Sequence, residues 1–79
     1  SMDGEDRLVF FRQLKEQLNQ FDTEAEQTVE KLIQSNTDKA QAIMLKNIAK
    51  SIVQYDFEKS LALLELIPYA TDTSTNNTT

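Results

Sequence analysis

The stretches Gln20-Phe21-Asp22-Thr23-Glu24 and Gln54-Tyr55-Asp56-Phe57-Glu58 share one pattern, Gln-aromatic-Asp-x-Glu, at an offset of 34 residues. Apolar residues precede and follow each stretch at helical spacing, so each stretch predicts a turn between two helices. In each turn we expect the aromatic side chain to close the apolar face of the preceding helix. We expect the aspartate to cap the following helix, where its charge also meets the positive end of the helix dipole.

Four helical segments are predicted around these turns. Apolar residues recur every three or four positions over residues 5–20, 23–35, 38–54 and 56–67. At the 34-residue offset the apolar positions align in five pairs: Phe11 with Leu45, Leu14 with Ile48, Leu18 with Ile52, Val29 with Leu63, and Ile33 with Ile67. The predicted fold class is all-α, a small antiparallel four-helix bundle made of two similar αα-hairpins. The alternative is that any two amphipathic hairpins of equal length align at some offset.

The apolar residues of each segment set its expected burial. Residues 23–35 carry a narrow apolar stripe, so this helix should be the most exposed, and Thr23 with Glu26 matches the capping-box pattern at its start. Residues 38–54 carry an apolar arc that covers more than half of the helix and includes Val53, so this helix should be the most buried. The core is expected to contain Leu14, Leu18, Ile48 and Ile52.

The two ends of the chain differ in composition from its middle. Residues 1–4, which begin Ser1-Met2, are interpreted as an expression remnant and an unstructured start, and residues 5–68 as the helical bundle. Residues 69–79 are rich in threonine and asparagine and have no apolar period, which predicts a disordered tail. The 79 residues form one domain at most, and a chain this short has a thin stability margin.

The charge and hydropathy of the chain exclude several classes of partner. Thirteen acidic and eight basic residues give a net charge of −5, which disfavours nucleic acid because phosphate binding needs a basic face. No apolar run approaches the ~20 residues that span a bilayer, so membrane insertion is not expected. The acidic start of the chain does not match a secretory signal. We therefore expect a cytoplasmic protein, or an excised cytosolic domain.

The side chains that most often perform catalysis are missing. The chain has no cysteine and no histidine, which removes the best nucleophile, the commonest general base and every structural zinc pattern. The only glycine is Gly4, so there is no glycine-rich phosphate loop. Glu26 and Glu30 lie four residues apart, as on an ordinary solvated helix face. We expect no enzymatic activity, no metal site and no cofactor.

A basic stripe on the third segment is the first candidate binding surface. Lys39, Lys46 and Lys50 fall within a narrow arc, Ile43 projects beside them, and residues 39–55 contain no acidic residue. Such a stripe can dock an acidic protein surface. In the alternative interpretation these lysines are only solvated and face the glutamates of the second helix.

The second candidate surface lies on the first segment. Val9 and Phe10 fall at or outside the edge of the apolar stripe. If exposed, they would contact another domain or a second copy of the chain, making the protein a monomer or a weak homo-oligomer. In the alternative interpretation Phe10 packs under a neighbouring helix.

Two stretches resemble a known kind of signalling domain. The pattern Leu8-x-x-Phe11-x-x-Leu14-x-x-x-Leu18, followed by Phe21-Asp22-Thr23-Glu24-Ala25, is similar to small helical domains of bacterial two-component proteins. So is the pattern Ile48-x-x-x-Ile52-x-x-Tyr55-Asp56-Phe57-Glu58-Lys59-Ser60-Leu61. Over about residues 8–67 the chain resembles a degenerate histidine-phosphotransfer domain, as found after the kinase and receiver domains of hybrid sensor proteins.

The resemblance implies a role in signal transduction without phosphoryl transfer. Phosphotransfer domains relay the phosphoryl group through a histidine, and this chain has none. The implied function is docking of a receiver or kinase domain without accepting phosphate. Two other interpretations remain open. The 34-residue offset also resembles a tetratricopeptide-like hairpin scaffold, which would leave a concave apolar face uncovered, and the Val9 and Phe10 edge would suit a homo-oligomerisation module.

Overall fold

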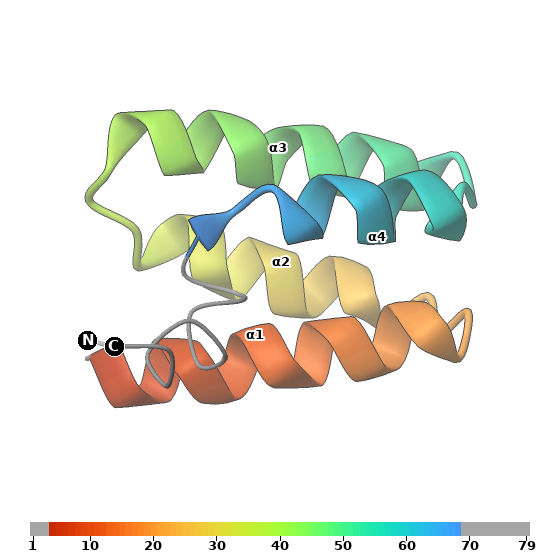
Figure 1. Ribbon diagram of the computed structural model, residues 1–79, viewed down its shortest axis with the longest axis horizontal. Helices are drawn as coiled ribbons and strands as arrows, with labels where there is room; N and C mark the ends of the chain where they lie inside the picture. The colour runs from red at the N-terminus through yellow and green to blue at the C-terminus, as the bar shows by residue number, and fades with distance from the viewer. Residues whose placement is uncertain (1–3, 69–79) are drawn as a thin grey trace, which may run out of the picture.

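The computed structural model describes residues 4–68 and contains four helices (Figure 1). They are α1 (Gly4–Asn19), α2 (Ala25–Gln34), α3 (Lys39–Val53) and α4 (Phe57–Glu65). Each helix coincides with one predicted segment apart from its ends, and no strand occurs among residues 4–68, so the all-α prediction is confirmed. The predicted tail at 69–79 lies outside the described residues, as do residues 1–3.

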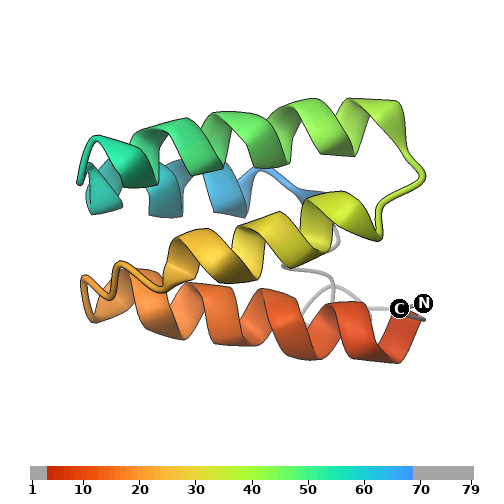
Figure 2. The ribbon, with the colours of Figure 1, turned by 180° about the vertical axis from the view of Figure 1, so that it is seen from behind.

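The four helices form a closed arrangement. α1 packs against α2 and α4, and α3 packs against the same two helices, while the backbones of α1 and α3 do not pack against each other within the described residues. Successive helices run in opposite directions, as the colour order shows from both sides (Figures 1 and 2). The packing is consistent with a bundle. An open array of hairpins would instead leave the first and last helices apart.

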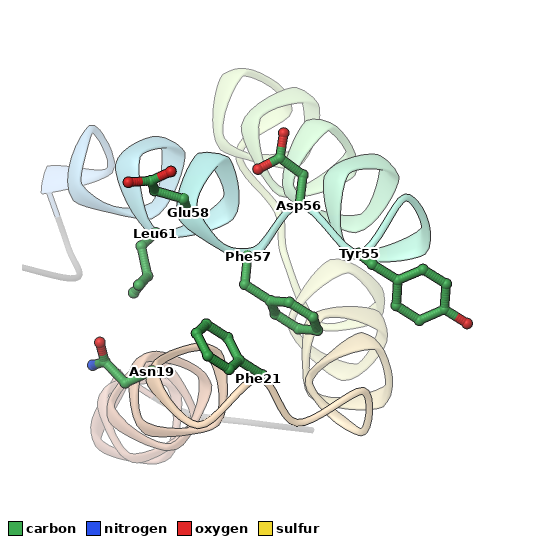
Figure 3. A pocket seen from close by; sticks show the side chains of 7 residues that line it. All are labelled: Asn19, Phe21, Tyr55, Asp56, Phe57, Glu58 and Leu61. Carbon is green, nitrogen blue, oxygen red and sulfur yellow. The ribbon is translucent and has the colours of Figure 1, made fainter.

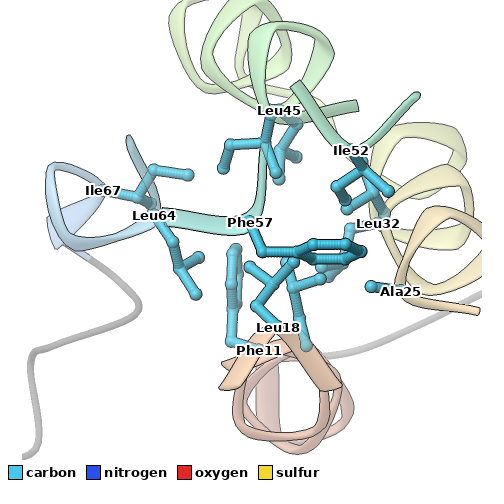
Figure 4. Close-up of a cluster of buried hydrophobic side chains, with 12 residues drawn as sticks. Phe11, Leu18, Ala25, Leu32, Leu45, Ile52, Phe57, Leu64 and Ile67 are labelled. Carbon is cyan, nitrogen blue, oxygen red and sulfur yellow. The ribbon is translucent and has the colours of Figure 1, made fainter. Parts of the chain in front are cut away.

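All four helices contribute to one apolar core (Figure 4). The predicted core residues Leu14, Leu18, Ile48 and Ile52 are buried, which confirms that part of the sequence analysis. Among residues 4–68 the buried apolar residues are Phe11, Leu14, Leu18, Ala25, Val29, Leu32, Leu45, Ile48, Ile52, Phe57, Leu64 and Ile67. The chain has no histidine and no cysteine, so close packing of these apolar side chains has to stabilise the core.

The predicted burial of the second and third helices is wrong. Four of the ten residues of α2 are buried, against four of the fifteen residues of α3. The neighbours of α3 cover only one side of it, and its apolar arc is wider than that side. Ile43 and Val53 therefore stay 62% and 59% exposed. The narrow apolar stripe of α2, by contrast, is no wider than the side of the helix that its neighbours cover.

Both α1 and α3 end in the same backbone turn. Phe21 and Tyr55 follow these helices with positive φ angles of 56° and 60°, the left-handed conformation of a Schellman-type C-terminus. Equivalent amides donate to equivalent carbonyls: Phe21 to Leu18 (3.2 Å) and Asp22 to Gln17 (2.9 Å), then Tyr55 to Ile52 (2.8 Å) and Asp56 to Ser51 (2.9 Å). The last carbonyls of both helices are thereby satisfied.

This turn places the two aromatic side chains in solvent. Phe21 and Tyr55 are each 71% exposed, so the prediction that they close the apolar faces is wrong. A left-handed residue just past the helix end turns the chain away from the helix axis and directs its side chain outward. The buried aromatic of the second turn is Phe57, two residues beyond Tyr55.

The two aspartates after these aromatics do different work. Asp56 is the N-cap of α4, and its Oδ1 accepts a hydrogen bond from the Lys59 amide at 3.1 Å, as predicted. Asp22 Oδ1 accepts from the Glu24 amide at 2.9 Å, but α2 begins only after Glu24. Asp22 therefore stabilises the connection before the helix and is not itself the N-cap.

The capping box predicted from Thr23 and Glu26 does not form. The N-cap of α2 is Glu24, which has a helical backbone and no side-chain capping bond. Thr23 instead contributes its carbonyl, which accepts from the Glu26 amide at 3.1 Å. Thr23 and Glu26 have the residue types and the spacing of a capping box. The turn at Phe21, however, is followed by a connection that extends beyond Thr23, so the helix begins only after Glu24.

The longer first connection also changes the register of the second helices. α2 buries Ala25, Thr28 and Leu32, and α4 buries Phe57, Ser60 and Leu64, an offset of 32 residues. The 34-residue alignment therefore holds for α1 with α3 and fails for α2 with α4. In that alignment Leu32 lies over Leu66, yet Leu32 is fully buried and Leu66 is 66% exposed.

Arg7 joins three parts of the chain at the end opposite to these turns. Its side chain is only 8% exposed, and its guanidinium lies 5.6 Å above the Phe11 ring. The guanidinium donates to the Leu32 carbonyl (3.2 Å), Ser35 Oγ (2.8 Å), Asn36 Oδ1 (3.3 Å) and Gln41 Oε1 (2.6 Å). One buried charge thus ties α1 to the end of α2, to the α2–α3 connection and to the start of α3.

Replacing Arg7 by alanine should destabilise the protein by about 3 kcal/mol, because one buried and three part-buried acceptors lose a charged donor together. Urea denaturation followed by far-ultraviolet circular dichroism measures this change. Arg12→Ala, on an exposed position of the same helix, is the control and should stay within about 0.5 kcal/mol of the parent chain. Equal losses in the two variants would contradict the role assigned to Arg7.

The left-handed turn makes a second prediction, at Tyr55. Tyr55→Gly should be more stable than Tyr55→Ala by about 1 kcal/mol, because only glycine avoids the steric cost of a positive φ angle. At the exposed helical position 62 the order should reverse, and Ala62→Gly should cost about 1 kcal/mol. Thermal unfolding of the three variants checks both signs. A glycine at position 55 no better than alanine would refute the turn geometry.

Candidate protein-binding surfaces

The outward face of α3 combines lysines with exposed aliphatic residues. Lys39, Ile43, Lys46 and Lys50 follow one another at spacings of four, three and four residues, which places them on one side of the helix, and all four are exposed. Val53 continues the row at its C-terminal end. The structure therefore brings the predicted stripe together and adds Val53, which the sequence analysis had assigned to the buried arc.

The charges on this face are not neutralised by their surroundings. α3 carries three lysines and no acidic residue, in a chain with a net charge of −5. Within residues 4–68, no ion pair joins Lys39, Lys46 or Lys50 to an acidic side chain. The described residues thus show no ion pair between these lysines and the glutamates of α2, and whether the lysines are only solvated or bind a partner stays a prediction. An acidic surface that met this face would find free positive charge.

One edge of α4 extends the face of α3. A hollow of about 250 Å³ lies between the two helices and is lined by Asn47, Lys50, Ser51, Gln54, Lys59 and Leu63. Beneath it the hydroxyls of Ser51 and Ser60 are hydrogen-bonded to each other, which fixes how the two helices pair. Leu66, 66% exposed, follows Lys59 and Leu63 at helical spacing and adds a second apolar side chain on this edge. We call residues 39, 43, 46, 50, 53, 59, 63 and 66 the basic face.

Sequence reasoning missed the contribution of α4 to the basic face. The apolar stripe of the fourth segment is formed by Phe57, Leu61, Leu64 and Ile67. Leu63 and Leu66 fall outside that stripe, and this was the one sign in the sequence that α4 has apolar residues on a second side. It becomes informative only when the pairing of α3 with α4 is known.

Val9 and Phe10 do not form a shared surface. Val9 is 54% exposed, whereas Phe10 is half-buried against the core. The Lys31 ammonium of α2 lies 5.8 Å from the centre of the Phe10 ring, a cation–π contact that covers part of it. Phe10 therefore packs under a neighbouring helix, as the alternative interpretation expected. Within the described residues the backbone of α1 does not pack against that of α3, and Val9 lies on α1, so Val9 also stands apart from the basic face.

A second hollow lies at the end of the molecule where both left-handed turns are found (Figure 3). Its volume is about 550 Å³, and it is lined by Asn19, Phe21, Tyr55, Asp56, Phe57, Glu58 and Leu61. The rings of Phe21 and Phe57 meet at 5.6 Å between centroids with a tilt of 53°. We call this the turn-end hollow. Sequence reasoning missed it because both exposed aromatics were expected to be buried.

Residues 4–68 contain neither a cluster of metal-binding side chains nor a membrane-spanning helix. This part of the chain contains no group of three or more acidic, histidine or cysteine side chains placed to hold a metal ion. None of its helices has the length and apolar character needed to cross a bilayer.

Comparison of the chain with protein-family models, with curated proteins and with solved structures found no match. Its function therefore has to be argued from the surfaces described above.

Proposed function

We propose that this chain is a non-catalytic protein-interaction module of bacterial signal transduction, which docks a receiver or kinase domain without accepting phosphate. The observation that carries the proposal is the basic face. It presents free lysines interleaved with exposed Ile43 and Val53 on a helix that has no acidic residue. The cytoplasmic setting and the partner class come from the resemblance to histidine-less phosphotransfer domains.

The chemistry of the basic face defines the partner surface. Residues 39–53 extend over about 21 Å at the rise of an α-helix, enough to cover one helix of a partner. The exposed aliphatic residues gain from burial, while the lysines attract carboxylates and can keep their ammonium groups at the solvated rim. We therefore propose that the partner presents a helix with acidic residues beside a short apolar stripe. Contacts of this size favour a weak, reversible complex.

We also propose that α1–α2 and α3–α4 are two copies of one αα-hairpin. The equivalent left-handed turns at Phe21 and Tyr55 support this. So do two polar contacts at matching positions. Thr28 Oγ1 donates to Gln17 Oε1 at 2.7 Å in the first pair of helices, and the hydroxyls of Ser51 and Ser60 meet in the second. The contact between α1 and α4 favours a closed bundle over a tetratricopeptide-like scaffold.

Titration tests the docking proposal. The ¹⁵N-labelled chain would be titrated with receiver domains and kinase cores of two-component proteins from the source organism. A partner should shift the amide signals of Ile43, Lys46, Lys50 and Val53. The double charge reversal Lys46→Glu with Lys50→Glu should weaken binding at least about tenfold, because attraction at two positions becomes repulsion. Raising the salt concentration should weaken the parent complex too.

Matched controls separate docking from general charge effects. Arg12→Glu with Lys15→Glu makes the same change of net charge on exposed positions of α1 and should leave the affinity almost unchanged. If no receiver or kinase domain shifts any signal at millimolar concentration, the proposed function is wrong. Sedimentation over a tenfold range of concentration tests the rival module, since self-association that Val9→Ser abolishes would favour homo-oligomerisation.

A further inference from the structure

The turn-end hollow has the opposite charge to the basic face. Asp56 and Glu58 line it, and no lysine or arginine does. Lys59, the neighbour of Glu58 in sequence, lines the hollow on the α3 side instead. Successive residues of α4 thus point to different sides of the helix and divide the charges between two surfaces.

The helix dipoles do not neutralise these carboxylates. The start of α4 contributes about +0.5 of a charge beside the hollow, and the end of α1 contributes about −0.5. The last turn of α1 contains no basic residue to compensate its end. The two dipole ends offset each other, so the two carboxylates leave the hollow clearly negative. A cation entering the hollow would meet both carboxylates.

The walls of the hollow are aromatic and aliphatic. Phe21, Phe57 and Leu61 line it together with Asp56 and Glu58, and Figure 3 shows the Phe21 and Phe57 rings beside each other, with the Leu61 side chain on the Asn19 side of the Phe21 ring. Phe21 is 71% exposed although its left-handed backbone carries a steric cost. A large apolar ring kept in solvent at such a position adds little to the core, and it is available to a ligand.

We propose that the turn-end hollow binds an arginine side chain from a basic peptide segment of a partner protein. A guanidinium stacks on an aromatic ring and pairs with a carboxylate through two parallel hydrogen bonds, which suits a site that offers both groups. The carboxylate that pairs with the guanidinium is Glu58, since Asp56 already accepts a hydrogen bond from the Lys59 amide. The aliphatic stem of the arginine packs along Leu61. This site is separate from the basic face and does not depend on the function proposed for it.

The aromatic lining of the hollow favours arginine over lysine. The ammonium of lysine is a strongly hydrated point charge, whereas the planar guanidinium is weakly hydrated and loses less when it covers a ring. The charge also excludes an acidic segment of the kind proposed for the basic face. The molecule would therefore hold segments of opposite charge at two places.

The test uses three capped tripeptides, acetyl-Ala-X-Ala-amide, in which X is arginine, lysine or citrulline. Citrulline has nearly the shape of arginine and no charge. Titrated into the full ¹⁵N-labelled chain, the arginine peptide should shift the amide signals of Asn19, Phe21, Phe57 and Glu58 with millimolar affinity. The lysine peptide should bind several-fold more weakly and the citrulline peptide at least about tenfold more weakly.

Variants within the chain sharpen the assignment. Glu58→Gln should weaken the arginine peptide at least about fivefold. Glu65→Gln removes the same charge from an exposed position two turns further along α4, and it should leave the affinity unchanged. Phe21→Gly removes the ring and relieves the left-handed backbone, so it should keep the fold, as checked by circular dichroism, and lose affinity.

Three results would overturn the proposal. Equal binding of citrulline and arginine would show that the hollow does not recognise a guanidinium. Shifts spread over the whole acidic surface, with Glu65→Gln as harmful as Glu58→Gln, would show only non-specific attraction. Shifts that depend on protein concentration without peptide, and that Arg12→Gln abolishes, would assign the hollow to a second copy of the chain. None of these results concerns the basic face, so the two proposals fail independently.

Discussion

The left-handed backbone of Phe21 and Tyr55 is the constraint on which most of this structure depends. It ends α1 and α3, lets the next amide satisfy their last carbonyls, and reverses the chain at the same end of the molecule (Figure 1). This conformation costs roughly 1–2 kcal/mol for a residue other than glycine, and the chain adopts it at both turns. Because the turn directs each ring outward, the feature that reverses the chain also builds the apolar wall of the turn-end hollow.

The opposite end of the molecule is held in another way. There the connection from α2 to α3 has no left-handed residue, and the buried guanidinium of Arg7 holds it through side-chain and carbonyl acceptors. A buried charge is tolerated only when its donors are used, and Arg7 meets this condition by reaching three segments at once. The turn end therefore relies mainly on backbone hydrogen bonds, whereas the opposite end adds the hydrogen bonds of one side chain, Arg7, to its own backbone bonds, such as that from the Ser35 amide to the Lys31 carbonyl. The opposite end is therefore more sensitive to one substitution.

Periodicity predicted the helices and the centre of the core, because Leu14, Leu18, Ile48 and Ile52 repeat at helical spacing and meet inside any compact arrangement of such helices. It failed where tertiary geometry decides. The width of the apolar arc of α3 gave no warning that its neighbours would leave Val53 uncovered. Thr23 and Glu26 matched a cap that a two-residue longer connection displaced. The sequence analysis assigned no role to Arg7, because its acceptors lie about 25 to 34 positions away in sequence and no local pattern connects them.

The short helix α4 belongs to both candidate surfaces. Glu58 and Leu61 line the turn-end hollow, while Lys59 and Leu63 line the hollow beside α3. An acidic partner on one side and an arginine on the other would bring opposite charges to two sides of one narrow helix. At physiological ionic strength a charge is felt over about 8 Å, and a helix with its side chains is about 10 Å across. Each partner would then attract the other weakly through α4, so the binding of one should modestly favour the other, and high salt should remove that effect before it removes the contact of either partner.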